Sequence, residues 1–377
     1  MGYESVDKLQ KLLAEEVFSY TDDRKKAAGR ALGTFLEIIT YYLIKTLGLE
    51  RFTAIEKPLP EFANAEITHN VEFTLHGSRK VGEFKYDRSQ FPISSKTVLR
   101  SLKTGDGSDG RAKSSTVINR NGVIRNACAL CSFPESFLNA YVDSSKEQCS
   151  VYRLLSHPFA MFECKRVGVE EGARKGPQTI EKAKQGSYVA RTVSALQRIR
   201  KADGSLAGFF QKSENDYVIS EYYGLLSSII DSGDVELLRN FILTVGVVSN
   251  HGNWFTSETP NKELKVLAQS YDWLLFLTDG GISEFITELL VAPDPKYEAV
   301  KAAFRSSYSP LKKGNVFTKV KMDCESDKAL CSYFSANQRR IEGWFNVISP
   351  NGMTLSDMKR DLSKLAAKDW GAVYGAF

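Results

Sequence analysis

A glutamate and a lysine two residues apart, Glu163 and Lys165, stand near the end of the apolar segment 159–167. On a strand they share one face, whereas Cys164 between them points to the opposite face, toward a core. Asp143 lies twenty residues upstream, before another apolar segment. If the two segments pair, two carboxylates and an ammonium meet, and carboxylate oxygens are ligands that Mg²⁺ prefers. Such a metal polarises a phosphoryl oxygen and activates water, while a lysine steadies the developing charge.

A second Glu-x-Lys pattern occurs earlier, at Glu83 and Lys85, with Glu72 as its upstream acid. The segment around Glu83 is more amphipathic, and a basic stretch follows it. The pattern at 163–165 is instead followed by a helix and two apolar strands. An isolated match of this kind is commonly an ion pair at a strand end. We therefore favour the pattern at 163–165, and expect 83–85 to lie in an edge hairpin whose charges face solvent or DNA.

Helices and strands alternate around these patterns. Hydrophobic periodicity predicts helices at 3–19, 22–47, 177–201, 217–231, 261–270 and 282–291. Alternating or continuous apolar runs predict a hairpin of 71–75 with 81–86, turning at 76–80, and strands at 151–155, 159–167, 241–248 and 273–277. This order predicts an α/β fold, a mixed β-sheet flanked by helices.

The chain divides by composition into three parts. Residues 1–295 are expected to form the core, which includes a basic insertion at about 88–126. Residues 296–377 are expected to form a helical C-terminal region whose basic stretches suit contact with DNA.

The insertion concentrates positive charge. Between Lys85 and Arg125 there are nine Lys and Arg and three Asp, an excess of six, whereas the whole chain has a net charge of +5. Tracking a phosphate backbone is one reason for such a segment, and a solvated, partly disordered insertion is the other. The candidate DNA contacts here are Arg88, Lys96, Arg100, Lys103, Arg111 and Lys113.

Asp143 followed by Glu163-Cys164-Lys165 resembles the PD-(D/E)xK nuclease superfamily, and type II restriction endonucleases in particular, over the order of elements in residues 25–290. The residue before Asp143 is valine, where the family has proline. The resemblance implies an accessory acid, Glu37, on the first core helix. It also implies a polar helix near the scissile phosphate, with Gln178, Lys182 and Gln185 as DNA contacts.

The function implied by the resemblance is sequence-specific cleavage of double-stranded DNA by a Mg²⁺-activated water, leaving 5′-phosphate and 3′-hydroxyl ends. Asp143 and Glu163 would hold one or two Mg²⁺ ions, Lys165 would position the nucleophile and Glu37 would assist. Cutting both strands calls for two sites, so a homodimer is expected. The alternatives are a repair or recombination nuclease of the same fold and a non-catalytic DNA-binding protein.

Other chemistries have weaker patterns. Cys128 and Cys131 have the spacing of a metal knuckle, so Zn²⁺ with Cys149 and His157 is an alternative to buried structural thiols. His251 follows an apolar strand and is a candidate for contact with DNA or metal. No phosphate-binding loop motif occurs, so we expect no nucleotide cofactor.

The cellular setting is inferred from composition. No apolar run approaches the roughly 18 residues that cross a bilayer, and six cysteines in 377 residues do not form a disulfide framework. We expect an intracellular protein without a membrane partner, in the cytoplasm of a prokaryotic cell.

Overall fold

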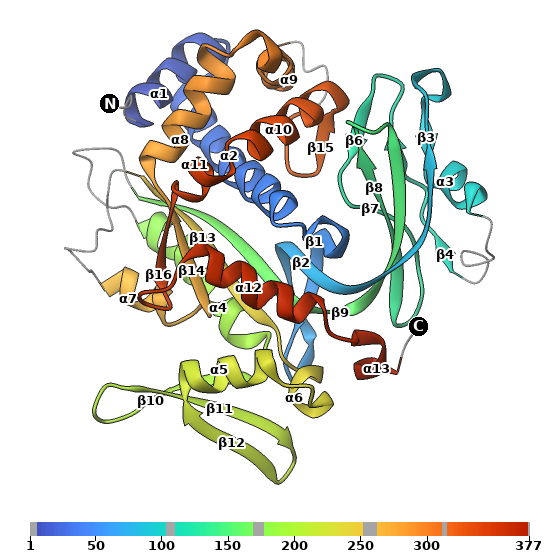
Figure 1. Ribbon diagram of the computed structural model, residues 1–377. Helices are drawn as coiled ribbons and strands as arrows, with labels where there is room; N and C mark the ends of the chain where they lie inside the picture. Colours follow the sequence, from blue (N-terminus) through green and yellow to red (C-terminus); the bar gives the residue numbers. More distant parts are fainter. Residues whose placement is uncertain (1–5, 103–109, 169–176, 252–261, 311–314, 376–377) are drawn as a thin grey trace.

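Two long strands, β2 (Asn64–Lys85) and β9 (Gln148–Gly168), run through the main sheet of the computed structural model, which describes residues 6–102, 110–168, 177–251, 262–310 and 315–375 (Figure 1). Within these ranges the sheet has nine strands, in the order β16-β14-β13-β9-β8-β7-β4, with β2 paired to β9 and β1 paired to β2. The other strands of this sheet are β1 (Thr53–Glu61), β4 (Arg111–Ala112), β7 (Cys128–Ser132), β8 (Ser136–Asp143), β13 (Leu243–His251), β14 (Trp273–Leu277) and β16 (Phe345–Ser349).

The sheet is mixed, as expected. Strand β13 lies parallel to β9 and to β14, whereas β2, β8 and β16 pair antiparallel with their neighbours. The first half of β9 lies beside β8, and its second half lies beside β13. The predicted strands at 159–167 and 273–277 are confirmed within β9 and β14, and the strand predicted at 241–248 is β13, which begins at Leu243. The prediction of a separate strand at 151–155 is wrong, because these residues belong to the same strand β9.

Helices pack on both faces of the sheet. Asp23 caps the N-terminus of helix α2 (Arg24–Thr46), because its side chain accepts a hydrogen bond from the Lys26 amide. The apolar side of this helix packs in one core with Phe73 and Phe162. Helices α4 (Pro177–Thr192) and α7 (Lys262–Ala268) pack on a second apolar cluster that includes Met161 and Val248. The remaining helices before residue 295 are α1 (Val6–Leu12), α3 (Ser95–Ser101), α5 (Tyr222–Asp231), α6 (Val235–Arg239) and α8 (Asp279–Ile286).

The predicted hairpin at 71–86 is wrong, because both segments belong to the single strand β2. The sequence suggested a turn at Gly77, but a Cβ at this position would lie 2.4 Å from Trp370 Cβ and 3.0 Å from Leu155. The register of β2 on β9 shifts on both sides of this residue. Gly77 therefore serves close packing at a bulge, a role that is also common for glycine in strands.

Two helices end or begin at places the sequence did not indicate. Helix α4 ends at Thr192, and β10 (Leu196–Arg200) occupies the end of the helix expected at 177–201. Strand β12 (Asp216–Glu221) precedes α5 within the helix expected at 217–231. With β11 (Leu206–Ser213), these strands form a separate three-stranded sheet.

The basic insertion is not one long loop. It contains α3, β4 and the short strands β3 (Ile93–Ser94), β5 (Thr116–Ile118) and β6 (Val123–Arg125), and it buries Val98, Val117 and Ile124 in the core. The absence of a regular apolar period in this segment reflects the shortness of its elements. Strand β15 (Lys321–Asp323), from the C-terminal part of the chain, pairs with β6.

Residues 296–377 are largely helical, in α9 (Glu298–Ser307), α10 (Cys324–Ala336), α11 (Gln338–Glu342), α12 (Leu355–Ala366) and α13 (Trp370–Tyr374). They also supply β15 and β16 to two sheets. The C-terminal region thus shares sheets with the core that precedes it. None of the described helices is both long and apolar enough to cross a bilayer.

Candidate active site

Three glutamates form a row across neighbouring strands of the main sheet. Phe73 of β2 pairs with Phe162 of β9, which sets Glu72 beside Glu163. The register of β1 on β2 likewise sets Glu56 beside Glu72. The sheet therefore gathers carboxylates that are far apart in the sequence.

Lys165 lies against this row. Its Nζ is 2.6 Å from Oε1 of Glu163 and 3.8 Å from Oε1 of Glu72. The predicted alternation is confirmed: Glu163 and Lys165 share a face, whereas Cys164 is buried in the core beneath α2.

A second lysine, Lys319, enters the row from the C-terminal region. Its Nζ lies 3.0 Å from Glu37 Oε2, 3.4 Å from Glu56 Oε1 and 3.9 Å from Glu72 Oε1. The structure thus places Glu37, from α2, beside the strand carboxylates. Glu37, Glu56, Glu72, Glu163, Lys165 and Lys319 are called the carboxylate row below.

Two oxygens of the row lack a donor. Oε2 of Glu72 and Oε2 of Glu163 are buried and accept no hydrogen bond, and the two carboxyl groups lie within hydrogen-bonding reach of each other. Two ionised carboxylates in such contact repel each other unless a proton or a cation lies between them. Burial, followed by the neighbouring Glu72, raises the pKa of Glu163 to about 8.

The neighbouring carboxylates also affect the pKa values of the two lysines. Burial lowers the pKa of Lys165, but Glu163 and Glu72 more than offset this, so the pKa stays above its ordinary value. The pKa of Lys319 is likewise lowered by burial and raised further by Glu37 and Glu72. Both side chains are therefore fixed cations at neutral pH.

The two donor-free oxygens fit a hard divalent cation, because Mg²⁺ takes oxygen ligands and is commonly held by one or two carboxylates. Across the described ranges, no three His, Cys, Asp or Glu side chains already form a metal-holding group. Glu72 and Glu163 are thus the residues that could hold Mg²⁺.

Glycines let bulky groups approach the row closely. A Cβ at Gly246, which pairs with Glu163, would lie 2.7 Å from the Tyr271 ring. A Cβ at Gly186 of α4 would lie 2.6 Å from Tyr271 Oη and 3.2 Å from Glu163 Cγ. Tyr271 and α4 therefore form a tight wall beside Glu163, with no room for a larger residue at either glycine.

The assignment of Asp143 as a catalytic and metal-binding residue is corrected by its position. Asp143 pairs with Gln148, at the start of β9, fifteen residues before Glu163. Asp143 lies near Lys45 of α2, which is eight residues, or about 12 Å along the helix, from Glu37 of the row. Asp143 instead pairs with Lys146, 2.9 Å away, and lines a cavity of about 380 Å³. The prediction for Asp143 was wrong because β9 is a single long strand. Strand β8 pairs with the first half of β9, whereas Glu163 lies in the second half.

The rival pattern at Glu83 and Lys85 lies at the far end of β2 from Glu72. Glu83 is exposed, and its nearest cation is Lys80 Nζ at 2.6 Å. Glu72, which the sequence offered as the upstream acid of this pattern, belongs with Glu163 and Lys165.

Among the described residues, the candidate DNA contacts of the insertion form no ion pair or hydrogen bond with the carboxylate row. Lys96, Arg100, Arg111 and Lys113 are exposed, and β4 is the outermost strand next to β7 and β8 rather than near β13. Arg88 pairs with Glu325. Lys103 falls outside the described residues.

On α4, Gln185 is exposed at the position before Gly186. Tyr188 packs its ring against His69, 5.7 Å away, not against the carboxylate row. The side chains of Gln178, Lys182 and His251 fall outside the described part of the structure.

The cysteines considered for Zn²⁺ are buried thiols. Cys128, Cys131 and Cys149 lie in the core at 1% exposure or less, and burial raises the pKa of Cys149 to about 12. The ring of His157 stacks on Tyr374, 4.9 Å away. These surroundings favour structural thiols over metal ligands, which need the thiolate form.

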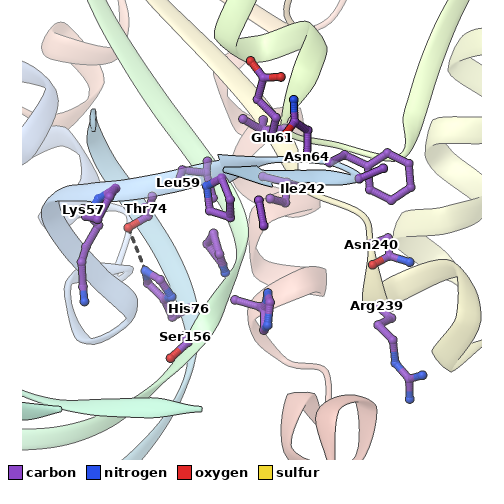
Figure 2. A pocket seen from close by; sticks show the side chains of 18 of the residues that line it. Lys57, Leu59, Glu61, Asn64, Thr74, His76, Ser156, Arg239, Asn240 and Ile242 are labelled. Carbon is purple, nitrogen blue, oxygen red and sulfur yellow. Dashed lines mark hydrogen bonds between the residues drawn. The ribbon is translucent and has the colours of Figure 1, made fainter. Parts of the chain in front are cut away.

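A cavity of about 560 Å³ opens farther along β2, beginning at Thr74. Figure 2 shows Lys57 and Arg239 on opposite sides of it, with His76 hydrogen-bonded to Thr74. The Lys57 ammonium lies 3.5 Å from the Phe137 ring centroid. Glu61 forms a separate pair with His69. Because its charged groups are spread apart, this cavity lacks the convergence that marks the carboxylate row.

Comparison with protein-family models, with curated proteins and with solved structures found no match for this chain.

Proposed function

We propose that this protein is a Mg²⁺-dependent endonuclease that hydrolyses phosphodiester bonds in double-stranded DNA, with a core of the restriction-endonuclease type. The observation that carries the proposal is the contact of Glu72, Glu163 and Lys165, with one buried, donor-free oxygen on each glutamate. The order of elements supports it: α2 with Glu37, then β2 with Glu72, β9 with Glu163 and Lys165, α4, and the parallel strand β13.

Glu72 and Glu163 would hold the metal through their free oxygens. When bound, Mg²⁺ supplies a Lewis acid that polarises a phosphoryl oxygen and lowers the pKa of water. Lys165, one-quarter exposed beside two almost buried carboxylates, is placed to neutralise charge on the phosphorus oxygens. The water oxygen bonds to phosphorus, the bond to the 3′ oxygen breaks, and a proton passes to that oxygen.

The row is partly exposed to solvent. Glu163 and Lys319 are nearly buried, whereas Glu56 is more than half exposed and Lys165 and Glu37 are partly exposed. A phosphate group would therefore approach Lys165 from solvent, while the carboxyl group of Glu163 stays in a medium where charges interact strongly. Since the described residues of one chain form one such row, cutting both strands of a duplex would be done by a homodimer.

The test is cleavage of supercoiled plasmid with Mg²⁺. We expect the native protein to give discrete fragments and Lys165→Ala to cleave at least about 100-fold more slowly while still binding DNA. Lys85→Ala is the matched control, a lysine of the other Glu-x-Lys pattern, and should cleave at the native rate.

Other results would redirect the proposal. Loss of cleavage in Lys85→Ala with full activity in Lys165→Ala would move the site to the end of β2. A ladder of random cuts would indicate a repair or recombination nuclease. DNA binding without any cleavage in Mg²⁺ or Mn²⁺ would indicate a non-catalytic DNA-binding protein.

A further inference from the structure

Lys319 sits at the tip of a tight turn that is anchored on both sides. The Thr318 amide donates to the Lys321 carbonyl at 2.9 Å, and Phe317 and Met322, both fully buried, bridge below the turn. The side chain of Asn126 donates to the Lys319 carbonyl at 3.0 Å. The backbone of Lys319 is therefore held both by contacts within the turn and by Asn126, from a distant part of the chain.

The ammonium of Lys319 is held as firmly as its backbone. Only 7% of the side chain is exposed, and carboxylates from α2, β1 and β2 surround it at 3.0, 3.4 and 3.9 Å. An isolated ammonium costs several kcal/mol to bury, so this one depends on the three glutamates. Its Nζ is in contact with both Glu37 and Glu72.

The charges of the row indicate how many divalent ions it accepts. When all four carboxylates are ionised, as they would be with a metal bound, they and the two ammoniums leave two negative charges, which one divalent ion neutralises. The donor-free oxygens are on Glu72 and Glu163, whereas Glu37 and Glu56 face Lys319. In nucleases with two metals, the ions lie about 3.5–4 Å apart and need ligands on both sides.

We propose that Lys319 is a resident cation that takes the place of a second metal, so that the chain binds a single divalent ion between Glu72 and Glu163. This inference rests on the proposed metal-dependent function. It changes the role expected for Glu37, which becomes the partner of Lys319 and not a metal ligand.

The test counts Mn²⁺ ions on the full-length protein without DNA, by electron paramagnetic resonance of free Mn²⁺ during titration. We expect one ion per chain for the native protein and for Lys319→Arg, which keeps the charge. Lys319→Met removes the charge but keeps the apolar stem, and is expected to bind two ions. Lys321→Met, an exposed lysine of the same turn, is the matched control and should bind one.

A second measurement does not depend on the folding of Lys319→Met. In the otherwise native chain, Glu37→Gln should change Mn²⁺ affinity by less than about threefold, whereas Glu72→Gln should weaken it at least about tenfold, as expected for a lost ligand. Two ions on the native chain, one ion on folded Lys319→Met, or equal effects of the two glutamine variants would each overturn the inference. Absence of any Mn²⁺ binding to the native chain would instead overturn the metal site of the proposed function.

Discussion

Helix α2 takes part in two clusters of buried charge, and they are built differently. Toward its C-terminal end, Lys45 pairs with Asp327 at 3.0 Å and Glu50 at 3.4 Å, and Tyr42 donates to Asp327 at 2.7 Å. In the carboxylate row, eight residues earlier at Glu37, two glutamate oxygens are left without a donor. The Lys45 cluster is complete within the protein, whereas the row has surplus acceptors.

The difference separates a structural role from a chemical one. A buried ion pair whose partners match holds elements together, here α2 and α10. Buried oxygens without donors cost stability, and such a cost is commonly retained where a ligand later satisfies the group. Asp143, which sequence spacing had suggested as a metal ligand, lines the cavity beside the Lys45 cluster.

The largest expected effect distinguishes the two upstream acids. Glu72→Gln removes a proposed metal ligand and should lower the rate of plasmid cleavage at least about 100-fold. Asp143→Asn, at the cavity beside Lys45, should leave the rate within about twofold of native. Similar losses in both variants would erase the distinction between the clusters.

A large effect on stability is expected at the Lys45 cluster. Asp327→Ala leaves the nearly buried Lys45 ammonium with Glu50 alone, and should lower the free energy of unfolding by about 3–5 kcal/mol. Urea denaturation followed by circular dichroism measures this. Asp143→Ala, which removes an exposed ion pair from the same cavity, should cost less than about 1 kcal/mol. An Asp327→Ala protein as stable as native would contradict a structural role for this cluster.

An effect that builds up gradually concerns pH in the metal-free protein. Because the pKa of Glu163 is raised from 4.5 to about 8, the folded state holds a proton that the unfolded state has released in this range. Stability from this group is full below pH 4.5 and is lost as pH rises toward 8, by up to about 1 kcal/mol per pH unit.

Glu163→Gln should lack this loss, so its unfolding free energy in EDTA should exceed that of the native protein increasingly from pH 5 to pH 8. Asp143→Asn should keep the native dependence on pH. A native protein and a Glu163→Gln variant with parallel pH profiles would show that the row carries no shared proton.

The sequence by itself determined the local features of the site. Alternation on a strand placed Glu163 and Lys165 on one face with Cys164 in the core, and this follows from backbone geometry alone. Helical periodicity placed Glu37 on a helix, and continuous apolar runs marked β13 and β14 as buried strands. The mixed α/β class followed from the order of these elements.

The tertiary structure decided which distant groups meet. Glu72 was recognised as an acid but assigned to the wrong lysine, because strand register depends on pairing partners and bulges that no local pattern specifies. Lys319 and Glu56 carried no local signal, since Lys319 sits on a turn from the C-terminal region and Glu56 meets the row only through the pairing of β1 with β2. Asp143 had suitable spacing in the sequence, but the length of β9 separates it from Glu163. Charge clusters form through contacts between remote segments, so their membership is fixed only when the chain is folded.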